Sequence, residues 1–486
     1  MSAPDLAGLR AGGSERRWRR GLALALAGLA LLVLARIGWE LRPLAWLDAA
    51  PPQPAAAAAG LPAEPQARGA YLARVGHCAG CHTAPGGPPL AGGKPVATPF
   101  GSLPAANLTP DPATGLGGWT AEDLGRALRH GRRPDGGLIH PVCPTDAFAL
   151  LDPADVRALH AHLQAQAPVV QPRAGGSLPT LLRQPLALAV WRALYRRPPE
   201  APAAPPPPRP GDPPWTEALA AEWARGAYLV RGPAHCQACH VERNALGGPT
   251  DRRGGGPMPA RDWFAPSLHD NAEAGVGDWP LDEIVALLRD GHAPRGLAQG
   301  PMAQVVLGST QHLSAPDLRA MALYLQRLAP PAAAAVAGPP ADPPGRLAAA
   351  ADPAATGQAA PRPSEEALAA LATGPRLYAQ HCAACHGAQG EGVLGAEGVP
   401  AVPPLAGSRM IGQASPANLL RVVLEGGFGP ATAGHPQPFG MPPFDPVLSD
   451  AELLALIAHL RTRWGPPGLP PPSAFALRQL RERRAD

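Results

Sequence analysis

The chain has 486 residues, which is room for about three or four domains of ordinary size. Its 56 glycines and 67 prolines are a proportion typical of disordered sequence, and we expect disorder only in the connecting segments. The formal net charge is +4, and no basic stripe is interleaved with aromatic side chains, so composition argues against a nucleic-acid partner.

The N-terminal segment, residues 1–49, carries an export signal. Arginines at positions 16, 17, 19 and 20 precede an uncharged apolar run from Gly21 to Ala35, which is typical of a signal sequence. Apolar residues continue beyond Arg36 and no A-x-A site closes the run, so we expect an uncleaved anchor. A removed signal peptide is the alternative, and twin-arginine export fits the flanking residues poorly. In either case the arginines stay on the cytoplasmic side of the membrane, and the chain from about residue 50 onward is exported.

A pentapeptide, Cys-x-x-Cys-His, occurs three times in the exported part, each time after a predicted helix. The copies are Cys78–His82, Cys236–His240 and Cys382–His386, and together they contain six of the seven cysteines. On a helix, positions i, i+3 and i+4 share a face. Two thiols can therefore add to the vinyl groups of one haem while the histidine meets its iron from the same side.

Other chemistries of these cysteines are disfavoured. A structural zinc site needs a second Cys or His pair in each domain, and a redox dithiol is expected near a βαβ pattern; the sequence offers neither. We therefore predict three covalently bound haem c groups. The predicted thioether residues are Cys78, Cys81, Cys236, Cys239, Cys382 and Cys385, and the predicted proximal iron ligands are His82, His240 and His386. In bacteria such attachment occurs on the periplasmic side of the inner membrane, which agrees with the export signal.

Each motif belongs to a predicted all-α unit. An amphipathic helix leads into the motif, a middle helix starts after Trp119, Trp279 or Ser415, and a closing helix starts at Asp152, Ser314 or Ser449. The predicted segments are a linker 50–65, domain one 66–170, a linker with a short helix and a proline run 171–215, domain two 216–328, an Ala/Pro-rich linker 329–366, domain three 367–464 and a basic tail 465–486. We expect the tail to be solvated, with acidic lipid or a partner subunit as alternatives.

Three of the five tyrosines fall in the helices that lead into the motifs: Tyr71, Tyr228 and Tyr378. We expect each of them to pack its helix on the closing helix of the same domain.

The sixth iron ligand is predicted from the loop before each closing helix. Met302 lies 62 positions after His240, and Met441 lies 55 positions after His386. With only six methionines in the chain, we predict that these two ligate iron, the alternative being that they are core residues.

Domain one departs from this pattern. Cys143 lies 61 positions after His82, where a methionine is expected. Cys143 is our predicted ligand, as a thiolate that lowers the reduction potential. His140 is a second possible ligand, and a five-coordinate or water-ligated iron is a third possibility.

These residues resemble the trihaem cytochrome c subunits of membrane-bound bacterial dehydrogenases for alcohols, gluconate, fructose or aldehydes. The resemblance covers about residues 65–464 and rests on Gly69–Leu72, His77–Thr83, Thr98–Gly101, Asn107–Trp119, His235–His240, Arg243-Asn244, Leu246–Gly248, Gly300–Ser314, Cys382–Gly387, Pro403–Gly407 and Met441-Pro442. It implies three tandem class I cytochrome c domains. It also implies that Pro89 and Pro404 supply the carbonyls that orient the proximal histidines. Cys143, and Val241 in place of a threonine, depart from the family pattern.

The resemblance also implies the role of the chain. Electrons come from a flavin- or PQQ-dependent catalytic subunit and pass from haem to haem to ubiquinone or a terminal oxidase. The sequence contains no substrate-oxidising site of its own. Two alternatives stay open: a haem enzyme acting on peroxide or sulfur compounds at the first haem, and a free-standing periplasmic relay.

Overall fold

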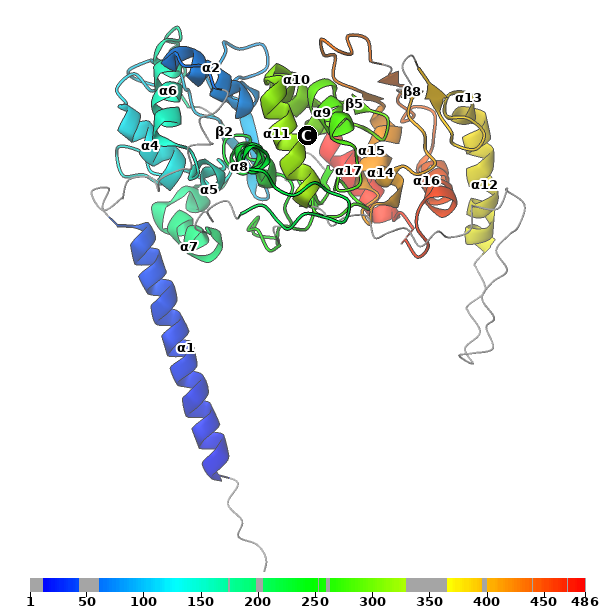
Figure 1. Cartoon of the computed structure of the whole chain (residues 1–486). Coiled ribbons are helices and arrows are strands. Elements are labelled where there is room, and N and C mark those ends of the chain that lie inside the picture. The colour runs from blue at the N-terminus through cyan, green and yellow to red at the C-terminus, as the bar shows by residue number, and fades with distance from the viewer. Residues whose placement is uncertain are drawn as a thin grey trace, which may run out of the picture.

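The computed structural model in Figure 1 describes residues 12–42, 61–173, 175–197, 204–251, 253–258, 263–328, 365–395, 400–438, 440–469 and 471–485. Within these residues the chain is largely helical, and its strands pair only in two-stranded antiparallel ladders. The helices form three groups, each with its own hydrophobic cluster. The three groups stand in a row, and α1 projects from one end of it (Figure 1).

The first group follows the long helix α1 (Gly12–Glu40). It contains α2 (Pro65–Val75), α3 (Cys78–His82), β1 (Pro95–Thr98), β2 (Gly101–Pro104), α4 (Ala121–His130), α5 (Thr145–Phe148) and α6 (Pro153–Gln164). Helix α4 begins with a capping box between Thr120 and Asp123. A connector of a 3-10 turn, η3 (Thr180–Arg183), and α7 (Pro185–Tyr195) comes next. The short helix predicted within the linker 171–215 is therefore present as α7, separated from the 3-10 turn by Gln184.

The central and third groups repeat this order with more short strands. The central group contains α8 (Glu217–Arg231), η4 (Cys236–Ala238), β3 (Gly256–Pro257), β4 (Phe264–Ala265), α9 (Leu281–Asp290), β5 (His292–Ala293), β6 (Gly296–Leu297), α10 (Gly300–Gly308), η5 (Thr310–His312) and α11 (Ala315–Leu328). The third group contains α12 (Glu365–His381), α13 (Ala383–His386), β7 (Val393–Leu394), β8 (Pro400–Val402), α14 (Arg409–Gly412), α15 (Ala417–Glu425), β9 (Gly427–Phe428), β10 (Gly440–Met441), α16 (Asp450–Trp464) and α17 (Ala474–Ala485).

The central contact of each group is the crossing of its first helix over its closing helix, α2 on α6, α8 on α11 and α12 on α16. A glycine makes each crossing possible. A Cβ at Gly69 would lie 1.9 Å from the carbonyl oxygen of Ala158, and a Cβ at Gly226 would lie 1.9 Å from that of Ala320. At Gly374 the corresponding distance, to Ala455, is 2.7 Å. Only glycine lets these backbones approach so closely, and this approach fixes where the following motif begins.

Closing helix α16 starts as predicted, with a capping box in which Ser449 and Glu452 satisfy each other's backbone amides. Asp152 likewise accepts a hydrogen bond from the backbone amide of Ala154 at the start of α6. The linker 329–364 and most of the linker 50–65 lie outside the described residues.

The expectation of a solvated C-terminal tail is wrong for α17. Leu477 and Leu480 are buried in the third cluster, and Arg481 forms ion pairs with Asp445 and Asp450. The two leucines lie three positions apart and so form one apolar, buried face of α17. The arginine-rich composition of the tail hid this pattern in the sequence.

The three groups touch one another directly. Val75 at the end of α2 belongs to the hydrophobic cluster of the central group. Asn418 of α15 exchanges two 2.8 Å hydrogen bonds with the backbone of Phe264. Arg409 of α14 donates to Asp278 at 2.9 Å. The described residues thus form a continuous array from the first group to the third.

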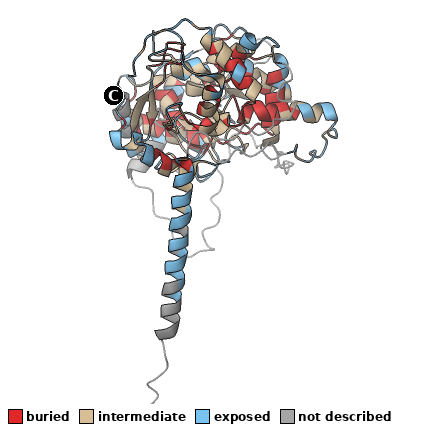
Figure 2. Cartoon of the chain, turned by 90° about the vertical axis from the view of Figure 1, so that its left-hand side faces the viewer, coloured by how far each residue is buried: buried red, intermediate tan, exposed pale blue. Residues whose placement is uncertain are grey.

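Helix α1 is the only part of the described chain that is long and apolar enough to cross a membrane, over Gly21–Glu40 with a mean hydropathy of 2.1. Its side chains are mostly exposed, whereas the groups have buried interiors (Figure 2). Ile37, near the end of the helix, packs against Leu188 and Ala189 of α7.

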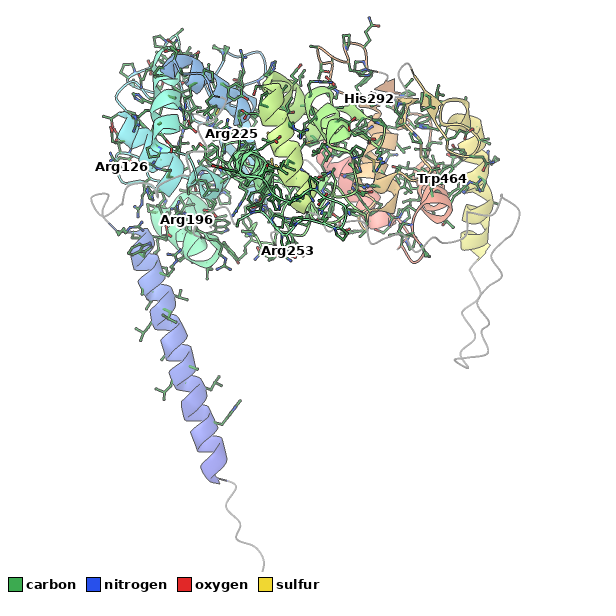
Figure 3. All side chains as sticks on the ribbon, in the orientation of Figure 1. Arg126, Arg196, Arg225, Arg253, His292 and Trp464 are labelled. Atoms are coloured by element: carbon green, nitrogen blue, oxygen red, sulfur yellow. The ribbon has the colours of Figure 1, made fainter. Side chains whose placement is uncertain are left out.

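The last residue of α1 ties this helix to the first group. Glu40 is buried, and Arg192 of α7 donates from Nε to its Oε2 atom at 2.9 Å. Arg196, labelled near the end of α1 in Figure 3, lies 3.9 Å from Oε1. Arg132, which follows α4, donates to the backbone carbonyl of Glu40. Because these arginines are buried or nearly so, α1 is held by charge pairing as well as by apolar contact.

We predict that Gly226→Ala destabilises the protein by about 3 kcal/mol, because the new Cβ forces α8 and α11 apart. This cost exceeds the roughly 1 kcal/mol by which alanine is favoured over glycine within a helix. Thermal unfolding followed by circular dichroism measures the loss. Gly118→Ala is the control, since nothing lies within 4 Å of its Cβ position and it should leave the melting temperature unchanged. Equal effects of the two variants would mean that the close approach of α8 and α11 at Gly226 does not exclude a side chain.

Candidate functional site

Each Cys-x-x-Cys-His segment begins one to five positions after the last residue of the first helix of its group. In the first and central groups the residue before the motif, His77 or His235, has a positive φ of 49° or 39°, which histidine tolerates better than most residues. Helical hydrogen bonds then join His240 to Cys236 (3.1 Å) and His386 to Cys382 (2.9 Å), and α3 spans the whole first motif. The helical spacing assumed for the motif residues is therefore present, in a short turn separate from the preceding helix in the first and central groups and with a tighter 3-10 start in the central group.

The three motif histidines share one orientation. Nδ1 of His82 lies 2.7 Å from the carbonyl oxygen of Ala106, Nδ1 of His240 lies 2.7 Å from that of Pro266, and Nδ1 of His386 lies 3.0 Å from that of Pro403. A carbonyl only accepts, so Nδ1 carries the hydrogen and Nε2 keeps its lone pair. Burial lowers the pKa of all three rings, which keeps them neutral. Each ring is thus prepared to bind a metal through Nε2.

The resemblance named the wrong carbonyls for this contact. The expected residues were Pro89 and Pro404, but the structure places the Ala106 and Pro403 carbonyls at the histidines. In the third group the difference is one residue. In the first group, the hydrogen bond from Gly92 N to the His82 carbonyl brings the chain back to the motif, and the strands β1 and β2 then carry it to Ala106.

The two cysteines of each motif have different surroundings. The second ones, Cys81, Cys239 and Cys385, are exposed. Burial raises the pKa of Cys78 and Cys236 to about 12 and that of Cys382 to about 11. A planar group attached to both thiols would therefore have one edge against the core of the helical group and the other near the surface.

The predicted distal methionines lie on the cores of their own groups. Met302 is the third residue of α10 and packs, like Cys236, against the central cluster. Met441 lies in β10, paired with Gly427 of β9, and packs against the third cluster, which contains Cys382. Each methionine thus contacts the same cluster as the first cysteine of its motif.

In the first group, Cys143 lies in a turn just before α5. Burial, followed by the thiols of Cys81 and Cys78, raises the pKa of the Cys143 thiol to about 12. Cys143 is therefore close enough to both attachment cysteines to interact with them electrostatically. His140 accepts a hydrogen bond at Nδ1 from the backbone amide of Val142 (3.2 Å), and burial alone lowers its pKa to about 4. Of the two candidate ligands, Cys143 is the one whose pKa the attachment cysteines influence.

Two basic residues near the motifs were given no role from the sequence, although Arg243 is one of the residues on which the resemblance rests. Lys94 donates from Nζ to the carbonyl of Gly80 at 2.5 Å, and Arg243 donates from Nη2 to that of Ala238 at 2.7 Å. Both carbonyls belong to the residue before the second cysteine of a motif. The sequence separations, 14 and 5 residues, differ so much that no shared spacing pointed to them.

Comparisons with known proteins agree with this geometry. A family model described as cytochrome c matches residues 371–464. The chain is 36% identical over 422 residues to the cytochrome c subunit of a quinone-dependent alcohol dehydrogenase of Gluconobacter oxydans (strain 621H), covering 82% of this chain and 78% of that protein. It is 33% identical to the gluconate 2-dehydrogenase cytochrome c subunit of Pantoea cypripedii, covering 82% and 85%. A dihaem cytochrome c-type protein of Cereibacter sphaeroides is 35% identical, covering 62% of this chain and 97% of that protein.

Proposed function

Since this chain belongs to the family of cytochrome c subunits of bacterial alcohol and gluconate dehydrogenases, we propose that it is the trihaem electron-transfer subunit of such a complex. The observation that carries the proposal is the shared geometry of His82, His240 and His386. Each stands after two cysteines, is held at Nδ1 by a backbone carbonyl, and has Nε2 free for iron. We propose that the three helical groups are tandem class I cytochrome c domains, with the boundaries expected from the sequence.

The residues fit haem c at each motif. The cysteine pairs would hold the porphyrin through thioethers, the motif histidines would bind iron on one side, and Met302 and Met441 would bind it on the other in the central and third groups. When bound, the group supplies a one-electron iron couple. The protein residues fix the histidine tautomer, and their apolar side chains would cover the porphyrin at the first, more buried cysteine of each pair while the second, exposed cysteine lies near the surface.

The partners follow from the named relatives. A cytochrome subunit needs an electron donor, and the relatives are subunits of alcohol and gluconate dehydrogenases. We propose a flavin- or PQQ-bearing catalytic subunit as the donor, and ubiquinone in the membrane or a terminal oxidase as the acceptor. Co-purification with a dehydrogenase subunit, and haem reduction when its substrate is added, test this proposal. Isolation of a chain that no dehydrogenase accompanies or reduces would favour the free-standing relay.

The docking of α1 supports an anchor that is retained on the periplasmic face of the inner membrane. Removal of a signal peptide at about residue 49 would also remove Glu40 and leave Arg192 buried without its carboxylate. An unpaired buried charge costs about 3–5 kcal/mol. The Nη2 atom of Arg192 would keep only its contact with the carbonyl of His130 (2.6 Å). The folded first group therefore favours the uncleaved chain.

We predict three haems per chain and the loss of one haem when both cysteines of any single motif are changed to alanine. Intact-mass spectrometry and pyridine haemochrome spectra give the count. Cys143→Ala is the matched control, because the seventh cysteine lies outside the motifs, and this variant should keep all three haems. A control that loses a haem, or a double variant that keeps three, would contradict the assignment.

We also propose Cys143 as the distal ligand of the first haem, on the strength of its place beside Cys78 and Cys81. A thiol buried in this way stays protonated unless a cation such as ferric iron lies beside it. A thiolate ligand would give the first haem a lower potential than its two neighbours.

Cys143→Met should raise one of the three reduction potentials by on the order of 0.2 V and add one methionine-to-iron charge-transfer band. Spectroelectrochemical titration measures both. His140→Leu is the matched variant and should leave all three potentials in place. The reverse result, with only the His140 variant changing the spectrum, would make His140 the ligand.

Glu40→Ala should destabilise the first group by about 3 kcal/mol, because it leaves Arg192 unpaired. Arg36→Ala removes a half-exposed partner 3.7 Å from the same carboxylate and should cost less than about 1 kcal/mol. Thermal unfolding of the detergent-solubilised protein compares the two. Equal, small effects would mean that α1 is not docked as described.

The intact mass of the membrane-extracted chain should include residues 1–49.

A further inference from the structure

The first and central groups carry the same ion pair, an arginine bound to a buried aspartate. In the first group, Nε of Arg68 on α2 donates to Oδ1 of Asp155 on α6 at 2.6 Å. In the central group, Nε of Arg225 on α8 donates to Oδ1 of Asp317 on α11 at 2.8 Å, and its Nη2 donates to Oδ2 at 2.9 Å. Both aspartates are fully buried. Each pair joins the first helix of a group to the closing helix of the same group.

One helical turn after each arginine, a tyrosine crosses to the other group. The hydroxyl of Tyr71 on α2 donates to Oδ2 of Asp317 at 2.6 Å. The hydroxyl of Tyr228 on α8 donates to Oδ2 of Asp155. Figure 3 labels Arg225 in this region, where the first and central groups meet. The contact is reciprocal: the first helix of each group bonds to the closing helix of the other, as in a two-fold interface.

The tyrosines also cap the helices that they reach. The backbone amide of Ser314, at the start of α11, donates to the hydroxyl of Tyr71 at 3.1 Å. The backbone amide of Asp152, at the start of α6, donates to the hydroxyl of Tyr228 at 3.4 Å. Burial, followed by the adjacent aspartate, raises the pKa of Tyr71 to about 12, so its hydroxyl stays a donor at neutral pH.

The same interface brings the first two attachment segments together. His77 lies against Gly308 at the end of α10, where a Cβ would fall 2.1 Å from the His77 ring. His235 lies 3.1 Å through Nε2 from the carbonyl of Gly76, and its ring meets the edge of Phe148 in α5 at 5.5 Å. Helix α10 carries Met302, and α5 follows Cys143. The residue before the first motif therefore packs against the helix that carries Met302, and the residue before the second motif packs against the helix that follows Cys143.

We propose that Tyr71 and Tyr228 are positioning residues that lock the first two groups into one dihaem unit, in which haem 1 and haem 2 exchange electrons directly. The exchange is one electron leaving a ferrous iron, which becomes ferric, and entering a ferric iron, which becomes ferrous; no proton moves and no bond breaks. This inference rests on the proposed function, because it requires haem at both motifs.

The third group supplies the matched control. Its tyrosine, Tyr378, lies four residues after the crossing glycine Gly374, whereas Tyr71 and Tyr228 lie two residues after theirs. The hydroxyl of Tyr378 donates to the carbonyl of Gly387 in its own group at 2.5 Å, and its ring packs against Trp464 of α16. The expected packing role is confirmed for Tyr378, and Tyr228 is likewise buried in one cluster with residues of its own closing helix, α11. It is wrong for Tyr71, which packs against the central cluster, and the hydroxyls of Tyr71 and Tyr228 both cross between groups.

The test uses the full-length haem-loaded protein with Tyr71→Phe, Tyr228→Phe, the double variant and Tyr378→Phe. Pulsed electron paramagnetic resonance gives the distance distribution between the first two ferric irons, and flash photoreduction gives their rate of electron exchange. The wild-type protein and Tyr378→Phe should share one narrow distribution and one rate. The double variant should show a broadened distribution and a severalfold slower exchange, with haem content unchanged.

A double variant with the wild-type distribution and rate would overturn the inference. Should the double variant not fold, each single variant is expected to broaden the distribution, and two unchanged single variants would overturn the inference equally. Failure of the proposed function is distinct from both results, since it would appear as fewer than three haems in the wild-type chain.

Discussion

The crossing of the first and closing helices at a glycine sets the position of every Cys-x-x-Cys-His segment. In each group the backbone of one helix approaches that of the other to a distance at which no Cβ fits. The first helix then ends at the motif, so the motif inherits its position from the crossing. The carbonyl that orients the histidine comes from a different loop in each group, yet it meets the same atom, Nδ1, each time. Backbone placement, more than side-chain identity, thus prepares the histidines for iron.

Buried charge has a specific use in this chain. A buried ion pair contributes little net stability, because desolvation offsets most of the attraction, but the loss of one partner is costly. Such pairs therefore select one arrangement of helices over others. Asp155, paired with Arg68, and Asp317, paired with Arg225, each also accept a hydrogen bond from a tyrosine of the neighbouring group. These pairs therefore also restrict how the two groups are arranged relative to each other. The third group lacks this tyrosine and contacts the central group through Asn418 and Arg409 instead.

The parts of the molecule that depend on local spacing could be predicted from the sequence. The motif helices, the middle and closing helices and their caps follow from positions three or four residues apart, and the structure confirms them. The placement of Met302 and Met441 on the cores of their groups also agrees with the expected offsets, while their bonds to iron stay a prediction.

Contacts between distant segments could not be predicted in this way. The three tyrosine positions looked equivalent in the sequence because each follows a glycine in a similar helix. Tyr378, however, lies two residues further from its glycine than the other two tyrosines do, and its hydroxyl bonds within its own group. The carbonyls facing the histidines depend on loop paths that no pattern encodes. The docking of Glu40 on Arg192 joins residues 152 positions apart, and the sequence of the apolar run gave no sign of it.

The rigid attachment of α1 has a geometric consequence for electron delivery. The row of three groups extends sideways from the end of this helix rather than continuing its axis (Figure 1). If α1 stands across the bilayer, the row lies along the membrane surface, and the third group is held at a height similar to that of the first. A lipid-soluble acceptor diffusing in the plane of the membrane would then meet the long side of this row. Distance from the bilayer alone would therefore not decide which haem passes electrons to that acceptor.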